Sequence, residues 1–229
     1  MTFLIRTLRF TFQIIRYICH MGIDNFITFA LTAFLFIMTP GLDTIFVINK
    51  ALGQGKKAGI YSALGVNAGV LVHTVLAALG LSLIVAKSVL AFTIVKYLGA
   101  AYLIYLGVNK LISKSNGITL TAVDKADKSN LQNFLSGVVT NVLNPKVALF
   151  FLAFFPQFIK KEALSQSMPF VILGLTYVFL GLIWYVLLSL FVSFFSAKFI
   201  NNPKAGNWLN KFSGVAFVLM GLKVAFSKK

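Results

Sequence analysis

Long apolar segments follow one another along most of this chain, separated by short polar connections. A helix needs about 20 apolar residues to cross roughly 30 Å of hydrocarbon. By that criterion the pattern predicts six membrane-spanning helices, at 23–49, 58–86, 89–112, 133–159, 168–198 and 208–226. Unbroken apolar runs such as 148–155 lack the alternating polarity of a transmembrane β-barrel, and most of the segments lack the polar face of a soluble helix. The expected fold class is therefore an all-α integral membrane protein.

Two of the predicted helices, the first and the fourth, are interrupted by a polar motif that contains proline. These motifs are TPGLD at 39–43 and LNPK at 143–146, so that the breaks are expected at Pro40 and Pro145. A helix break exposes backbone groups that lipid cannot satisfy, and at membrane depth such groups are expected only where they line a protein cavity. The two breaks therefore indicate a transport site.

The two breaks occupy corresponding places in two halves of the chain. A second repeat signal is KYLGAAY at 96–102, which matches KFSGVAF at 211–217. We expect a three-helix repeat at 23–112, a polar connecting loop at 113–132, and a second three-helix repeat at 133–229. Because an odd number of helices separates equivalent elements, the two repeats are expected to be inverted in the membrane.

The composition supports a partner that is lipid and not nucleic acid. Hydrophobic residues make up 59% of the chain, the mean hydropathy is +0.89, and the formal net charge is +16. Nucleic-acid-binding proteins gather basic residues on one patch, whereas here they mostly separate the apolar runs. Basic connections follow the first, third and fifth predicted helices, which would all lie on the cytoplasmic side by the positive-inside rule.

Residues 1–22 form a leader that does not fit this arrangement, because Arg6, Arg9 and Arg16 would lie on the wrong side of the membrane. Either Met21 is the native start, or the leader is an interfacial amphipathic helix. The single cysteine, Cys19, also lies there. With no other thiol and two histidines, the chain is expected to use no metal and no other cofactor.

Two ionisable residues are predicted to lie deep in the membrane. Asp43 is the only acid expected there away from a segment end, at a cost of about 3 kcal/mol or more that marks such groups as functional candidates. It could alternate between a proton and an ammonium group, or it could cap the second half of the broken helix. Lys146 lies near the expected bilayer centre, where it could attract a substrate carboxylate or form a permanent ion pair with Asp43.

Polar residues near the breaks and on the second predicted helix complete the candidate set. Asn144 could bind substrate or satisfy carbonyls freed by Pro145. Asn67 and His73 fall on roughly opposite faces of one helix, and His73 could relay protons or simply bond to a neighbouring helix. The candidate substrate- or proton-binding residues are Pro40, Gly41, Asp43, Asn67, His73, Asn144, Pro145 and Lys146.

Several motifs, in this order, carry a resemblance to a known family: MTPGLDT, GQGKKAG, GVNAGVLVHTVLAALGLS, KYLGAAYLIYLGVNKL and LNPKVALFFLAFFPQF. From Gly22 onward the chain resembles the LysE/RhtB family of bacterial amino-acid exporters, of the homoserine, threonine and leucine efflux type. The family usually has a second proline where this chain has Leu42. The resemblance implies amino acids as substrates and a multi-pass location in the bacterial cytoplasmic (inner) membrane. A homo-oligomer is compatible with the sequence, which does not specify the oligomeric state.

These observations predict a secondary active transporter that exports amino acids or small zwitterionic derivatives. The chain has no nucleotide-binding motif of the GxxxxGK[ST] type, so proton antiport is the expected mechanism, with Asp43 as proton carrier. Two alternatives stay open. One is a membrane-embedded enzyme, and the other is a membrane assembly subunit that transports nothing; solute flux in sealed vesicles separates all three.

Overall fold

The computed structural model describes residues 21–83, 88–112, 129–192 and 203–227. The arginines and Cys19 of the leader, and most of the expected polar loop, lie outside these ranges. The described residues are predominantly helical, and one isolated antiparallel bridge joins Ile23 to Ile159. The described part of the chain is thus all-helical in architecture.

The helices, in chain order, are α2 Phe26–Met38, α3 Leu42–Leu76, η1 Ala77–Leu81, α5 Val89–Ile112, α6 Asn130–Val142, α7 Pro145–Leu149, η2 Phe150–Phe154, η3 Phe155–Phe158, η4 Lys161–Ala163, α8 Ser167–Phe191 and α10 Pro203–Phe226. The segments η1 and η2 are π-helical, and η3 and η4 are 3₁₀ turns. The chain leaves the helical path between α2 and α3 and again between α6 and α7, at the two proline motifs.

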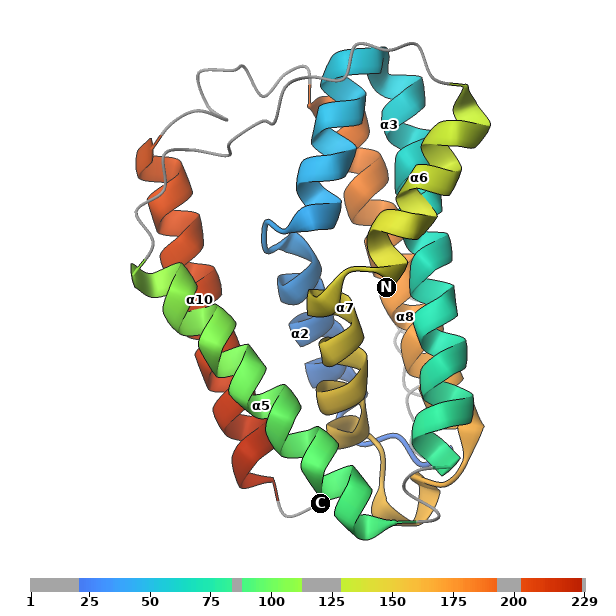
Figure 1. Cartoon of the computed structure of the whole chain (residues 1–229), viewed down its shortest axis with the longest axis vertical. Helices are drawn as coiled ribbons and strands as arrows, with labels where there is room; N and C mark the ends of the chain where they lie inside the picture. Colours follow the sequence, from blue (N-terminus) through green and yellow to red (C-terminus); the bar gives the residue numbers. More distant parts are fainter. Residues whose placement is uncertain (1–20, 84–87, 113–128, 193–202, 228–229) are drawn as a thin grey trace, which may run out of the picture.

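A single residue, Gly55, divides α3 into two helices. Its backbone has φ 88° and ψ 171°, a left-handed conformation that glycine tolerates and other residues rarely adopt. A Cβ atom added there would meet nothing within 4 Å, so the requirement comes from the backbone and not from packing. The chain reverses direction at this point (Figure 1). The polar connection expected between the first two predicted helices is therefore mostly helical.

Three described helical segments are long and apolar enough to cross a membrane: Leu42–Leu81, Val89–Ile112 and Ser167–Phe191. A fourth candidate is the bent pair Asn130–Val142 and Pro145–Phe158, whose two parts meet at 49°. The helix α2 is apolar but has only 13 residues. By length and composition alone, the described chain thus provides three or four candidate spans, against the six predicted from the sequence.

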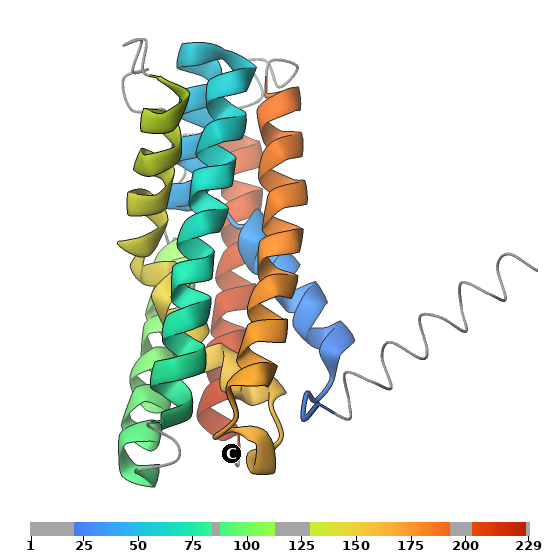
Figure 2. The same cartoon turned by 90° about the vertical axis from the view of Figure 1, so that its right-hand side faces the viewer.

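The helices form two packed groups, with the short segments α2, α7 and η2 between them. On one side α3 packs against α6 and α8, and on the other α5 packs against α10 (Figure 1). Figure 2 shows α3, α6 and α8 running side by side along the long axis. The core between the groups is rich in fully buried phenylalanines, namely Phe29, Phe36, Phe150, Phe151, Phe154, Phe155 and Phe158. The short helix α2 thus buries one face in this core, while Ile27, Leu31 and Leu35 on its other face are exposed.

The start of α6 is fixed by a capping box. Ser129 Oγ accepts a hydrogen bond from the Gln132 backbone N–H at 3.2 Å, and Gln132 Oε1 accepts one from the Ser129 N–H at 2.9 Å. This reciprocal pair satisfies backbone donors that a helix start leaves free. The helix therefore begins at Asn130, within the range 113–132 that the sequence suggested for the polar loop.

Glycines bring α3 and α6 into backbone contact. A Cβ atom on Gly65 would lie 2.0 Å from the Phe134 carbonyl oxygen, and one on Gly137 would lie 2.6 Å from the Ser62 carbonyl oxygen. Neither position has room for a larger side chain. The seam sets the distance between the two helices that carry most of the polar residues described below.

Candidate functional site

The two helix breaks free two carbonyls at equivalent positions. In a helix, the carbonyl four residues before a proline loses its usual donor, because proline has no backbone N–H. These carbonyls belong to Phe36, before Pro40, and to Asn141, before Pro145. Both lie in the buried core of the molecule. Each carbonyl therefore needs another donor.

Lys146 supplies the donor for the first break. Its Nζ donates to the Phe36 carbonyl at 3.0 Å and to the Thr39 carbonyl at 2.9 Å. The same ammonium lies over the rings of Phe36 and Phe217, at 4.5 and 5.6 Å from their centroids. A positive charge at a helix C-terminus also interacts favourably with the helix dipole. Lys146 of the second half thus closes the end of α2 in the first half.

His73 contributes in the same way to the second break. Its Nε2 lies 3.1 Å from the Asn141 carbonyl oxygen, which also accepts from the Asn144 backbone N–H at 2.9 Å. Because a carbonyl oxygen only accepts, Nε2 must carry a proton in this arrangement. The first half therefore supplies a side-chain donor to the second half.

Asp43 lies in the first turn of α3 and is 5% exposed. Its Oδ2 accepts a hydrogen bond from Asn141 Nδ2 at 2.9 Å, whereas Oδ1 has no hydrogen-bond partner within the part of the chain that the structure describes. The N-cap residue of α3 is Gly41, which receives no side-chain cap there. The expectation that Asp43 caps α3 is thus not met, since its carboxylate bonds across to α6.

Asn144 caps α7. Its Oδ1 accepts from the Lys146 backbone N–H at 3.1 Å, while its backbone N–H serves the carbonyl freed by Pro145. Within the described ranges, Asn144 Nδ2 and Asn141 Oδ1 have no hydrogen-bond partner. Asn141 is fully buried and Asn144 is 2% exposed. We call Asp43, Asn141 and Asn144 the polar cluster.

Asp43 and Lys146 do not form a direct ion pair. This pair was one of the two roles expected for Lys146, the other being attraction of a substrate carboxylate. The Asp43 carboxylate accepts a hydrogen bond from Asn141 Nδ2 and lies within interaction range of the Asn144 side chain, whereas the Lys146 ammonium bonds to carbonyls at the end of α2. The two charges still lie within electrostatic range of each other, as do Asp43 and His73. They influence one another without contact.

Asn67 lies at a different seam. Its Nδ2 donates to the Ala63 carbonyl of its own helix at 2.8 Å, and a Cβ atom on Gly181 of α8 would lie 2.5 Å from its Oδ1. His73, by contrast, bonds to α6. The two residues therefore face different neighbours, as their spacing along the helix predicted.

Asn141 is the residue that the sequence reasoning missed. It contributes an amide to Asp43 and a carbonyl to His73, and its side chain fits because Gly69 faces it; a Cβ atom there would lie 2.8 Å from Asn141 Oδ1. The sequence feature that could have identified Asn141 is its position four residues before Pro145, in an otherwise apolar stretch. A polar side chain on a residue whose carbonyl is freed by proline would have made Asn141 a candidate.

A cavity of about 360 Å³ lies between α2, η2 and α10, separate from the residues of the polar cluster. Apolar side chains line most of it, with Thr32 and Lys223 as polar members.

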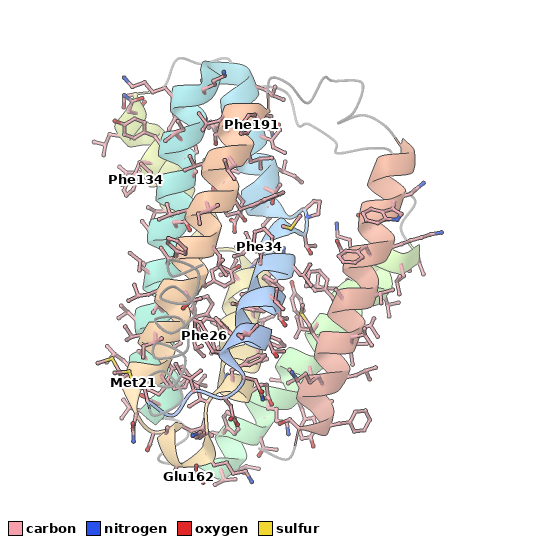
Figure 3. All side chains as sticks on the ribbon, turned by 180° about the vertical axis from the view of Figure 1, so that it is seen from behind. Met21, Phe26, Phe34, Phe134, Glu162 and Phe191 are labelled. Carbon is pink, nitrogen blue, oxygen red and sulfur yellow. The ribbon has the colours of Figure 1, made fainter. Side chains whose placement is uncertain are left out.

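In Figure 3, Phe34 lies on α2 beside α8, where its ring meets Trp184 edge-on at 6.1 Å between centroids. Among the described residues, no group of three potential metal-ligating side chains occurs.

A family model described as LysE type translocator matches residues 34–228. The chain belongs to the LysE family. This LysE-family protein is 35% identical over 203 residues to the uncharacterized membrane protein YrhP of Bacillus subtilis, covering 85% of this chain and 95% of the relative. It is 30% identical over 211 residues to the homoserine/homoserine lactone efflux protein of Salmonella typhimurium, covering 91% and 99%.

A third relative is the leucine efflux protein of Enterobacter sp., 32% identical over 212 residues that cover 89% of this chain and 96% of the relative. No solved structure matches this LysE-family protein. Membership of a translocator family, with efflux proteins among the relatives, makes the chain a transporter and not an enzyme.

Proposed function

We propose that this LysE-family protein exports amino acids or small zwitterionic derivatives across the bacterial cytoplasmic membrane as a secondary transporter coupled to protons. Relatives named for leucine and homoserine efflux support the substrate class. The observation that carries the proposal is the polar cluster, whose atoms without partners are buried where two broken helices meet. Buried polar groups of this kind are costly unless a ligand uses them.

Six spans in two inverted repeats are the arrangement that fits these features best. Leu42–Leu81 has 40 residues, about 60 Å of helix and twice the hydrocarbon thickness, and it folds back at Gly55. The broken pair α2–α3 and the broken pair α6–α7 run in opposite directions (Figure 1). Each half supplies a donor to the carbonyl that proline frees in the other half, through Lys146 and His73.

The site offers a complementary group for each of the two charged ends of a zwitterion. The N-terminus of α3 has backbone N–H groups and the positive end of a helix dipole, which suit a carboxylate. Lys146 adds charge there, since a Cβ atom on Gly41 would lie 3.4 Å from its Nζ. The free carboxylate oxygen of Asp43 suits an ammonium group. The site thus favours small solutes that carry both charges.

Asp43 is the proton carrier in this proposal. A proton and a substrate ammonium would compete for its Oδ1, so that the two are bound alternately, as antiport requires. The other acids among the described residues are Asp24 and Glu162. Glu162 is exposed at the end of the molecule where Met21 also lies (Figure 3). Asp43 is thus the buried acid among the described residues.

The test is amino-acid flux in proteoliposomes under an imposed pH gradient. Asp43→Asn keeps an oxygen that can accept from Asn141 Nδ2 but cannot titrate, so gradient-driven flux should be lost while the protein still inserts. Glu162→Gln is the matched control and should behave as wild type. Wild-type flux through Asp43→Asn would refute the proton-carrier role, and no flux of any amino acid through the wild type would refute export.

A further inference from the structure

We infer that the polar cluster is an ammonium subsite that requires N–H donors from its ligand, with Asn141 Oδ1 as a second acceptor beside Asp43 Oδ1. The inference rests on the proposed function and deepens it. It assigns a binding role to Asn141, and it predicts that the transporter separates primary amines from fully methylated ones.

The hydrogen-bonding capacity of the cluster is unbalanced. Asp43 Oδ2 is bonded to Asn141 Nδ2, and Asn144 Oδ1 is bonded to the Lys146 backbone N–H. In the described part of the chain, two acceptor atoms and one donor group remain without partners, namely Asp43 Oδ1, Asn141 Oδ1 and Asn144 Nδ2. Each of the two oxygens can accept two hydrogen bonds, so acceptors stay in excess even if the Asn144 amide turns toward Asp43.

The Asp43 carboxylate also has no direct contact with a cationic side chain among the described residues. The nearest cationic candidates are Lys146 and His73, and both direct their nitrogens to carbonyl oxygens of the helix breaks. A suitable ligand group is therefore positive and offers several hydrogens. A primary ammonium has three N–H donors, whereas a quaternary ammonium has none.

The geometry holds the second acceptor in place. The bond from Asn141 Nδ2 to Asp43 Oδ2 fixes the plane of the amide, so that Asn141 Oδ1 cannot rotate away without breaking it. Gly69 leaves the space that this orientation needs, since a Cβ atom there would lie 2.7 Å from Asn141 Cβ. The two acceptors are thus preorganised, which reduces the entropic cost of binding.

The experiment uses the full chain in proteoliposomes preloaded with leucine, and measures counterflow of radiolabelled leucine. Unlabelled leucine, N-methyl-leucine, N,N,N-trimethyl-leucine and N-acetyl-leucine compete from outside. We expect N-methyl-leucine to compete within about tenfold of leucine, and the trimethylated and acetylated compounds to compete at least about a hundredfold less well, because they leave buried acceptors unpaired.

Two variants assign the effect to the cluster. Asn141→Leu keeps the volume but removes the amide, so that leucine should compete at least about tenfold less well and the preference over trimethyl-leucine should shrink. Thr140→Val is the matched control on the same helix and should keep the wild-type preference, since Thr140 Oγ1 donates to the Ser136 carbonyl of its own helix and not to the polar cluster.

Equal competition by trimethyl-leucine and leucine in the wild type would overturn the inference, whether or not Asn141→Leu folds. An unchanged preference in folded Asn141→Leu would overturn the assignment to Asn141 and indicate that water occupies the cluster. Both results leave amino-acid export intact. Absence of counterflow with leucine, and with any other amino acid in the same assay, would instead refute the proposed function.

Discussion

Two titratable side chains in this molecule replace the backbone donors that proline removes. Lys146 bonds to the carbonyl freed by Pro40, and His73 bonds to the carbonyl freed by Pro145. The two sites differ in one respect. The Asn141 carbonyl also accepts from a backbone N–H, whereas the Phe36 carbonyl depends on Lys146 among its described contacts. Lys146 is therefore expected to matter more for stability.

At this residue scale we predict that Lys146→Met destabilises the protein by about 2–3 kcal/mol, because two carbonyls at the end of α2 lose a charged donor. Lys146→Arg should retain most of the stability, since a guanidinium can still donate to both. Thermal unfolding in detergent measures the difference, with the exposed Lys57→Met as control.

The double variant Lys146→Met with Asp43→Asn separates carbonyl capping from ion pairing. If Lys146 mainly caps α2, neutralising Asp43 does not restore stability, and the two effects add. A buried ion pair behaves in the opposite way, because the second substitution removes the charge that the first left unpaired. Recovery of wild-type stability in the double variant would therefore contradict the capping role.

Sequence alone could select Asp43, His73, Asn144 and Lys146, because a polar group in an apolar segment is visible without any structure. It could not supply their partners. The acceptors for Lys146 are main-chain carbonyls on a helix remote in sequence, and which carbonyls they are depends on how two broken helices meet. Asn141 was missed for the same reason, since the pairing of α6 with α3 carries its role.

At the scale of elements, the seam between α3 and α6 controls the site. The part of α3 after Gly55 touches α6 through Gly65 and Gly137, and it carries His73, which bonds to the Asn141 carbonyl of α6. The GxxxG spacing of Gly65 and Gly69 is visible in the sequence and is typical of close helix packing. It could not predict that the partner would be α6, because small residues occur on several of the helices.

We predict that Gly137→Ala lowers both stability and transport, since its Cβ would lie 2.6 Å from the Ser62 carbonyl oxygen and would push α6 away from α3. Overpacking of this kind costs roughly 1–3 kcal/mol. The matched control is Gly80→Ala, where a Cβ atom meets nothing within 4 Å. Equal thermal stability and leucine flux in the two variants would show that the seam tolerates a wider spacing.

At the scale of the whole molecule, the positions of charge and of chain reversals agree with the proposed six spans. In Figure 1 the Gly55 reversal lies at the top of the molecule, above the start of α10 and the end of α5. Basic residues lie close in sequence to each of these points, namely Lys56, Lys57, Lys110 and Lys211. The sequence pattern predicted that the basic connections share a side. It did not predict that helix would continue on both sides of one non-helical residue, Gly55, because no apolar pattern marks that position.

Cysteine labelling tests this topology, because the chain has one cysteine, Cys19, that can be replaced by serine. In that background we predict that Glu162→Cys reacts with an impermeant maleimide in intact cells, whereas Lys57→Cys reacts only after the membrane is permeabilised. Both residues are exposed, and three proposed spans separate them. An odd number of crossings must place them on opposite sides.

The same experiment distinguishes two crossings by Leu42–Leu81 from one. If this segment crossed once as a single tilted helix, Lys57 would lie near its middle, in hydrocarbon, and its cysteine would stay unlabelled even after permeabilisation. If it folds back at Gly55, Lys57 is in water and labels rapidly. Retained leucine flux in each labelled variant ensures that the accessible form is the working one. Labelling of both positions from outside would reject the inverted six-span arrangement, and with it the opposed broken helices on which the proposed site depends.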